Sequence, residues 1–598
     1  MSERWSVLRE RNLVGAVDHH LAIALGRLFG EERREVLEAV ALASRSVEEG
    51  HTHLDLSAWL GDTETAADLS WPRSEPWLDA LASSPLVAVD SAGDDVAAPL
   101  VLAPSGKLYL TRLWRAERRV AERLHERAAA TEAVDTAWLR AALDRLAPET
   151  GVLDRQRLAA AVALLRRLAV ITGGPGTGKT WTVAKVLALW VEHALAQGRR
   201  PPQVRLLAPT GKAAARLGEA VRAAADELGL PDAVRACIPT EAETLHRALG
   251  MGADGRFRNR TDWTCDAAVV DEASMVDLEL LRRLLDTLPP RARLVLLGDR
   301  NQLASVAAGT ILADIGRHDT DATYSSEFAG VLRTVVAGVT VQKGDVPTIA
   351  DCSVALTENR RSRDSPKLVE LAEAILHGDE SSTLRLLRDG DDERVRLARP
   401  EDTGWVAAAC AQFERIVAHA SPEDQLAELG RFRILCAHRR GPASVESANA
   451  AVERELARRG WSGASTSLYG GRPILVERND YALGLFNGDL GVIRALEDGR
   501  REAVFAAAAG WRGIAPARLP AHTTVFAMTV HKSQGSELDD VALVLPEVTS
   551  PVLSRELLYT AVTRARRGVT VYGRDEVWAD GVRRRIRRGS GLRPLLWN

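Results

Sequence analysis

The chain has 598 residues, enough for three or four domains, and its apolar content of 46% allows large cores. Its formal net charge of −3 excludes a surface that is basic all over, so any nucleic acid would have to bind a local patch. Its five cysteines form no CxxC or CxxH pair, which argues against a zinc site or a disulfide framework. No run of 18 apolar residues is present, so we expect a soluble cytoplasmic protein with no membrane partner.

The first part of the chain carries no catalytic pattern. The spacing of its apolar residues favours helices over 21–29 and 33–47. We expect residues 1–140 to form a mostly helical domain for contacts with a partner.

A strand, a glycine-rich loop and an apolar helix follow one another in residues 168–190, which is the arrangement of a phosphate-binding P-loop. Glycines let successive backbone N–H groups point at one anion, and the helix N-terminus adds partial positive charge. Lys179 can reach the β- and γ-phosphates, and the Thr180 hydroxyl can bind Mg²⁺. The residues assigned to the nucleotide here are Gly173, Gly174, Pro175, Gly176, Thr177, Gly178, Lys179 and Thr180.

Further residues of a first motor domain, 150–345, fit the same chemistry. Gln156 lies one helix before the P-loop strand, where its amide could read both edges of adenine. Asp271 and Glu272 end an apolar strand, so that Asp271 could hold Mg²⁺ through water and Glu272 could polarise the attacking water. Gln302, after the next strand, is placed to sense the γ-phosphate.

Two stretches of this domain are candidates for contact with nucleic acid. Thr210 and Lys212 follow a strand that should end on the same rim of the sheet as the P-loop, and a plain strand–helix turn is the alternative. Thr244 and His246 lie further along the chain, where an ordinary helix explains the pattern equally well.

A second motor domain is expected over 346–598, with a β-rich insertion at about 450–520. Arg361 is a candidate γ-phosphate contact from across a cleft, and Arg564 lies where an arginine finger could reach ATP. The arginine-rich segment 583–588 is expected to be a helix with a solvated face.

Taken in order, these blocks resemble a superfamily 1 helicase and, more closely, the RecD family, the alpha subunits of RecBCD enzymes. The resemblance covers residues 153–573, with one departure at Arg360, where an aromatic residue is common. The blocks are Gln156, GGPGTGKT, APTGKAAA, VVDEAS, LLGDRNQLASV, LTENRRS, TVHKSQGSE and LYTAVTRAR.

The resemblance implies an α/β fold with two RecA-like P-loop domains, a helical N-terminal domain and a β-rich insertion in the second motor domain. It implies ATP-driven 5′→3′ movement on single-stranded DNA, work with RecB- and RecC-like subunits that include the nuclease, and repair of double-strand breaks. Gly535 and Glu537 are then assigned to ATP, and Thr529, His531 and Lys532 to DNA. Two rivals are a stand-alone RecD-like helicase and a subunit whose motor is vestigial.

Overall fold

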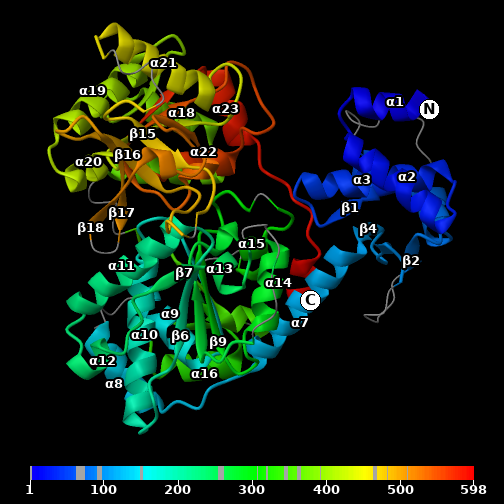
Figure 1. The fold of residues 1–598 in the computed structure, drawn as a ribbon. Coiled ribbons are helices and arrows are strands. Elements are labelled where there is room, and N and C mark those ends of the chain that lie inside the picture. The colour runs from blue at the N-terminus through cyan, green and yellow to red at the C-terminus, as the bar shows by residue number, and fades with distance from the viewer. Residues whose placement is uncertain are drawn as a thin grey trace.

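The computed structural model describes most of the chain. The described residues are 3–61, 74–89, 97–147, 153–252, 257, 262–305, 307–317, 321–342, 348–359, 365–390, 392–461, 468–480, 482–507 and 510–597. Two α/β units lie against each other, and the N-terminal part lies to one side of them (Figure 1). Over the described ranges, no helix is long and apolar enough to cross a membrane.

The N-terminal part combines helices with a small sheet. Its strand order is β1-β4-β3-β2, and a core around Trp77 and Leu42 lies between the sheet and the helices. The "mostly helical" expectation therefore omits a four-stranded sheet. The elements are α1 Glu3–Glu10, α2 Ala16–Phe29, α3 Arg34–Glu48, β1 His53–Asp55, α4 Leu56–Gly61, α6 Ser74–Ala82, β2 Val87–Val89, β3 Leu100–Leu102 and β4 Lys107–Leu110.

Six parallel strands form the first sheet, in the order β12-β5-β9-β8-β6-β7. Successive side chains of β5 enter different cores: Ala169 and Ile171 pack on one face, and Leu168 and Val170 on the other. A strand buried on both faces reads as an unbroken apolar run, which is why the sequence shows it so clearly. The strands are β5 Leu168–Gly173, β6 Val204–Ala208, β7 Ala242–Thr244, β8 Ala267–Val270, β9 Arg293–Gly298 and β12 Ser353–Leu356.

Helices cover both faces of the first sheet. Residues of α8, α9, α10, α11 and α16 belong to the core on one face, and residues of α7, α14, α15 and α24 to the core on the other. The helices are α7 Thr111–Ala129, α8 Thr136–Leu146, α9 Arg155–Leu165, α10 Lys179–Ala196, α11 Gly211–Glu227, α12 Asp232–Arg235, α13 Leu245–Ala248, α14 Leu278–Thr287, α15 Ile311–Ile315 and α16 Ser326–Arg333.

The structure moves one strand across the expected boundary at residue 346. β12 pairs with β5 in parallel, with Val354 opposite Ile171, so it belongs to the first sheet and not to the second unit. Residues 316–350, whose polar and irregular sequence is typical of an insertion or a linker, include α16 and a short parallel pair, β10 Thr323–Tyr324 and β11 Thr340–Val341. Nothing local in a parallel strand identifies its neighbour, so the sequence places such a strand poorly.

The second unit repeats the parallel design, with strand order β13-β22-β21-β14-β20. The fold class expected from the sequence is confirmed by these two sheets and by the antiparallel sheet described next. The elements are β13 Val395–Ala398, β14 Phe432–Cys436, β20 Ala527–Thr529, β21 Leu538–Val544, β22 Ala565–Tyr572, α17 Pro366–His377, α18 Glu380–Arg388, α19 Gly404–Ala418, α20 Pro422–Glu428, α21 Val445–Arg458, α22 Arg555–Val562 and α23 Asp575–Arg583.

An antiparallel sheet is inserted in the second unit, in the order β18-β17-β16-β15-β19. The turn before β16 reaches the first unit, because a Cβ atom on Gly211 would lie 2.8 Å from the Cβ of Phe486. The strands are β15 Pro473–Val476, β16 Leu490–Ala495, β17 Arg501–Ala507, β18 Gly510–Ile514 and β19 His522–Thr524.

The C-terminal segment, residues 584–597, returns from the second unit to the first (Figure 1). α23 ends at Arg583, so the helix expected over 583–588 is not formed. The Arg588 guanidinium donates to the carbonyl oxygens of Ser305 and Ala307 rather than facing only solvent. The closing helix α24 Leu592–Trp597 buries Leu592 and Leu596 in the core that α7 and α14 share.

Candidate ATP and nucleic-acid site

The P-loop connects β5 to α10 at the edge of the first sheet. Gly176 and Gly178 have φ angles of 81° and 82°, in the left-handed region that glycine adopts without strain. The Lys179 ammonium donates to the carbonyl oxygens of Gly173 (2.7 Å) and Gly174 (3.1 Å). These contacts hold the lysine over the loop, at the place where phosphate oxygens could accept its hydrogen bonds instead.

Gln156 lies against this loop. Its Nε2 donates to the carbonyl oxygen of Thr177 (3.2 Å), and its Oε1 accepts from the Lys185 ammonium (3.3 Å). The side chain is buried, and a Cβ atom on Gly178 would lie 2.2 Å from its Nε2. Gln156 therefore supports the loop backbone, and its reading of adenine stays a prediction.

Two carboxylates follow β8. Asp271 Oδ1 accepts a hydrogen bond from the Glu272 backbone N–H (2.8 Å). Burial raises the pKa of Asp271 to about 6, the charge of Glu272 adds to this rise, and the Lys179 ammonium opposes it. Glu272 has a φ of 51°, which costs a non-glycine residue free energy and is found most often at functional sites.

The donor set fits Mg²⁺. Thr180 is the second residue of α10, and with Asp271 it offers a hydroxyl and a carboxylate oxygen. Mg²⁺ prefers oxygen ligands and is usually held by one or two carboxylates together with substrate phosphates. Among the described residues no group of three or more His, Cys, Asp or Glu side chains could hold a metal by itself, so the phosphates would have to complete the site.

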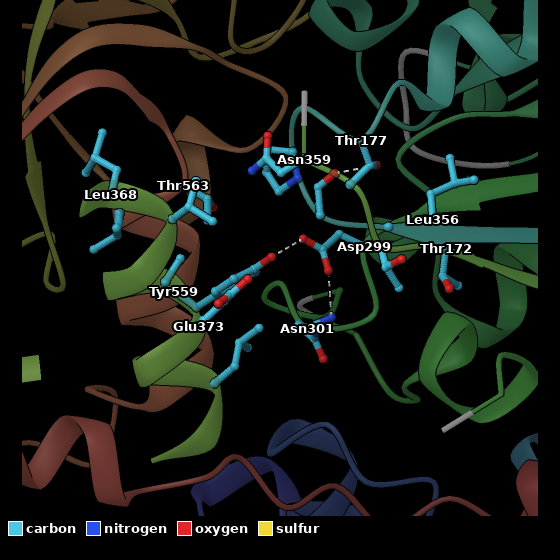
Figure 2. Close-up of a pocket in the computed structure, with 18 of the residues that line it drawn as sticks. Thr172, Thr177, Asp299, Asn301, Leu356, Asn359, Leu368, Glu373, Tyr559 and Thr563 are labelled. Carbon is cyan, nitrogen blue, oxygen red and sulfur yellow. Dashed lines mark hydrogen bonds between the residues drawn. The ribbon is translucent and has the colours of Figure 1, made fainter. Parts of the chain in front are cut away.

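The sensor loop, residues 299–303, follows β9 and contacts the second unit. The Tyr559 hydroxyl donates to Asp299 Oδ2 (2.9 Å), and Gln302 Nε2 donates to the same oxygen (3.2 Å). Figure 2 shows Tyr559 reaching from α22 to Asp299, whose other oxygen accepts from the Asn301 backbone N–H (3.0 Å). Burial raises the pKa of Tyr559 well above its usual range, so the hydroxyl keeps its proton and acts as the donor.

Two further bonds join the sensor loop to the second unit. The Leu303 backbone N–H donates to Thr560 Oγ1 (3.0 Å), and its carbonyl oxygen accepts from Gln534 Nε2 (2.8 Å). A cavity of about 300 Å³ lies between the units here, with Gly174 and Asp299 on one side and Tyr559 on the other (Figure 2). Helix α22 and the segment that carries Gln534, both of the second unit, thus contact the loop beside the P-loop.

Arg564 is buried in the second unit. Its Nε and a terminal guanidinium nitrogen donate to the carbonyl oxygens of Thr560 (3.2 Å) and Ser536 (3.1 Å). Burial lowers its pKa, while the charge of Glu272, in the first unit, is the largest influence that raises it. The charges of Arg564 and Glu272 therefore interact across the cleft. Arg361, its expected companion, lies outside the described residues.

Gly535 and Glu537 connect the units. The Arg216 guanidinium, on α11, donates to the Gly535 carbonyl oxygen (2.6 Å) and pairs with Glu537 Oε1 (3.1 Å). Glu537 Oε2 also accepts from Arg566 (2.6 Å). Sequence reasoning missed Arg216, although it lies four residues after Lys212 on the same helix face, and that spacing is the signal that could have found it.

The expected DNA contacts of the first unit are engaged within the protein. The hydroxyls of Thr210 and Thr244 cap α11 and α13 by accepting backbone N–H bonds. The Lys212 ammonium donates to Ser536 Oγ (2.7 Å), and burial lowers its pKa to about 7. Burial lowers the pKa of His246, while the charge of Asp277 and a hydrogen bond to the backbone carbonyl oxygen of Pro209 raise it.

The expected DNA contacts of the second unit surround one short helical turn. Thr529 Oγ1 accepts from the Lys532 backbone N–H (3.3 Å). The exposed Lys532 ammonium lies 3.6 Å from a carboxylate oxygen of Glu477. Burial lowers the pKa of His531, and the nearby charge of Arg588 adds to this.

Comparison with known proteins identifies the family. The model of the RecBCD enzyme subunit RecD N-terminal domain matches residues 10–109, that of an AAA domain 156–308, and that of a UvrD-like helicase C-terminal domain 524–572. The RecBCD enzyme subunit RecD of Mycobacterium tuberculosis is 40% identical over 99% of this chain and 97% of its own length. The chain belongs to the RecD family. The resemblance seen in the sequence is thereby confirmed.

Two other relatives show how far the family extends. The RecBCD enzyme subunit RecD of Haemophilus influenzae is 33% identical over 82% of this chain and 80% of its own length. The ATP-dependent RecD2 DNA helicase of Deinococcus radiodurans is 28% identical over 95% of this chain but only 70% of its own length. This chain thus matches the RecD subunit of Mycobacterium tuberculosis nearly end to end, whereas the RecD2 relative is longer than the matched region.

Proposed function

We propose that this chain is the ATP-driven 5′→3′ DNA helicase subunit of a RecBCD-type helicase–nuclease that repairs double-strand breaks by recombination. The observation that carries the proposal is the contact of Tyr559, Thr560 and Gln534, all from the second unit, with the sensor loop beside the P-loop. In a motor, the assembly of the hydrolysis site must depend on the relative position of two units, because only then does ATP turnover move one unit against the other.

Each side chain in the cleft has a role in hydrolysis. Lys179 binds the β- and γ-phosphates, and Glu272 orients and deprotonates the attacking water. Asp271 and Thr180 hold Mg²⁺, which when bound neutralises charge on the phosphates. Arg564 approaches the γ-phosphate as the cleft closes, since Glu272 already interacts with its charge.

Two further residues complete the proposed nucleotide site. Arg361 assists Arg564 from the second unit, and Gln302 senses the γ-phosphate. Gln156, Gly535 and Glu537 frame the site.

Movement along DNA requires two DNA-binding sites whose separation changes. One site is formed by Thr210 and Lys212 with Thr244 and His246, and the other by the turn 529–532. For Lys212 to bind a DNA phosphate it must exchange the Ser536 hydroxyl for the phosphate, and a charged donor bonds more strongly to a charged acceptor than to a hydroxyl.

The partners we propose are RecB- and RecC-like subunits in a cytoplasmic complex. The RecD N-terminal domain model and the end-to-end match with RecD subunits support this assignment over a stand-alone helicase. The nuclease activity would then lie in a partner.

The experiment is hydrolysis of ATP by the full chain with and without single-stranded DNA, followed by unwinding of 5′- and 3′-tailed duplexes. We expect ATPase that DNA stimulates, unwinding from the 5′ tail, and loss of both in Lys179→Ala and Glu272→Gln. Unwinding that requires added RecB- and RecC-like subunits supports a subunit, and full unwinding by the chain alone supports the stand-alone rival. ATPase that survives Lys179→Ala would refute the assignment of the site.

A further inference from the structure

The Tyr559 hydroxyl lies where three parts of the ATP site meet. It donates to Asp299 of the sensor loop, and a Cβ atom on Gly174 of the P-loop would lie only 3.0 Å from it. Yet Tyr559 belongs to α22 of the second unit (Figure 2). One hydroxyl of the second unit therefore contacts both the P-loop and the sensor loop.

A hydrogen-bonded chain leads from this hydroxyl to Gln302. Tyr559 and Gln302 both donate to Asp299 Oδ2, so the position of that carboxylate fixes the direction of the Gln302 amide. All three side chains are buried, with exposed fractions of 4%, 5% and 1% for Tyr559, Gln302 and Asp299. Hydrogen bonds to a buried carboxylate are strong, and the loss of one donor is felt by the other.

The hydrogen-bonded series from Tyr559 ends at the carbonyl oxygen of the Gln302 side chain. Gln302 Oε1 is buried and has no hydrogen-bond partner among the described residues. A buried acceptor without a partner raises the free energy of the state that contains it. Asp299 thus fixes the direction of the Gln302 amide, while the amide's carbonyl oxygen lacks a donor among the described residues. This is the state expected of a sensor that has not yet bound its ligand.

We propose that Tyr559 is a positioning residue that transmits the closure of the interdomain cleft to Gln302 through Asp299. The inference rests on the proposed function, since it takes Gln302 as the γ-phosphate sensor. Opening the cleft withdraws α22 and with it the Tyr559 hydroxyl, so Asp299 loses a donor and the Gln302 amide is free to turn away. Closure restores both bonds, and hydrolysis proceeds only with the second unit in place.

The test is Tyr559→Phe, which removes the hydroxyl and keeps the ring in the core of the second unit. We expect kcat for DNA-stimulated ATP hydrolysis to fall by about tenfold, because one hydrogen bond to a buried carboxylate is lost, with KM for ATP within about twofold. The matched control is Tyr572→Phe, a buried tyrosine of β22 whose hydroxyl lies beside Gly404 and should leave both constants unchanged. Thr560→Val, which removes the acceptor for the Leu303 N–H, should lower kcat in the same way.

To distinguish a positioning role from a merely structural one, Tyr559→Phe is also made in the Gln302→Ala variant. Single-turnover hydrolysis is measured, so that slow rates can still be detected. If Tyr559 acts through Gln302, Tyr559→Phe changes the rate by less than about twofold there, because the coupling partner is gone. Equal effects in both backgrounds, a change confined to KM, or no effect of Tyr559→Phe at all would overturn the inference. Lys179→Ala must abolish hydrolysis in the same series; if it does not, the proposed function fails first.

Discussion

Raising the pH should loosen the C-terminal segment from the first unit, because this segment covers a buried carboxyl group. Glu117 of α7 is 2% exposed, and its Oε1 accepts from the Gly591 N–H (2.8 Å) and the Ser590 hydroxyl (3.3 Å). Burial raises the pKa of Glu117 to about 7, the charge of Asp314 adds to this, and hydrogen bonds from Thr52 and the C-terminal segment oppose it. Release of the segment would expose the group and restore its ordinary pKa.

The sign and the size follow from linkage. The closed state binds the proton more tightly, so closing is favoured most below pH 4.5 and loses free energy as the pH rises from 4.5 to about 7. The difference between the ordinary value of 4.5 and about 7 corresponds to about 3 kcal/mol. Above about pH 7 the free energy of closing no longer changes with pH. Glu117→Gln cannot ionise, so it should remove the part of this slope that Glu117 contributes and leave the part due to Asp314, whose pKa burial raises to about 6.

The assay is hydrogen exchange of peptides from residues 585–597 between pH 5 and 8, corrected for the intrinsic rate. We expect the free energy of opening to fall by up to about 3 kcal/mol over this range in the natural chain and to fall clearly less in Glu117→Gln, where only Asp314 still titrates beneath the segment. Glu122→Gln, an exposed position on the same helix, is the matched control. A natural chain without a slope, or a Glu117→Gln variant with the same slope as the natural chain, would refute the reasoning.

Three other experiments test the packing around the cleft and the C-terminal segment. Gly178→Ala places a Cβ 2.2 Å from Gln156 Nε2 in a left-handed conformation, so a fluorescent nucleotide should bind at least about tenfold more weakly, and unchanged affinity would count against the loop geometry. Arg216→Ala and Glu537→Gln should each weaken DNA stimulation of the ATPase, with a coupling of about 1 kcal/mol because Arg216 is 38% exposed, and fully additive effects would contradict a direct bridge. Leu596→Ala should cost about 2–3 kcal/mol of local stability and speed proteolysis of the C-terminal segment, whereas an unchanged cleavage rate would exclude its role in docking.

The sequence predicts the local elements of the site well. The strand expected before the glycine-rich loop is found as Leu168–Gly173, α10 begins at Lys179, and Asp271 and Glu272 directly follow β8. These elements are specified by neighbours in the chain, since strand, glycine loop and helix each have their own pattern.

The partners of these elements could not be predicted in the same way. Lys212 and Ser536 are 324 positions apart, and Asp299 and Tyr559 are 260 apart. Such pairs are decided by how the two units pack, which no local pattern encodes. The same reason explains the misplaced strand β12 and the unexpected return of the chain at its C-terminus.

The contacts between the units explain why the expected DNA contacts are occupied by protein groups. Lys212 and Arg216 donate to residues 535–537 of the second unit, so the DNA contact proposed for Lys212 and the contact with the second unit would use the same face of α11. DNA bound to this face would have to displace these contacts between the units. If Lys212 binds DNA as proposed, DNA binding and the position of the second unit are coupled by competition for the same donors.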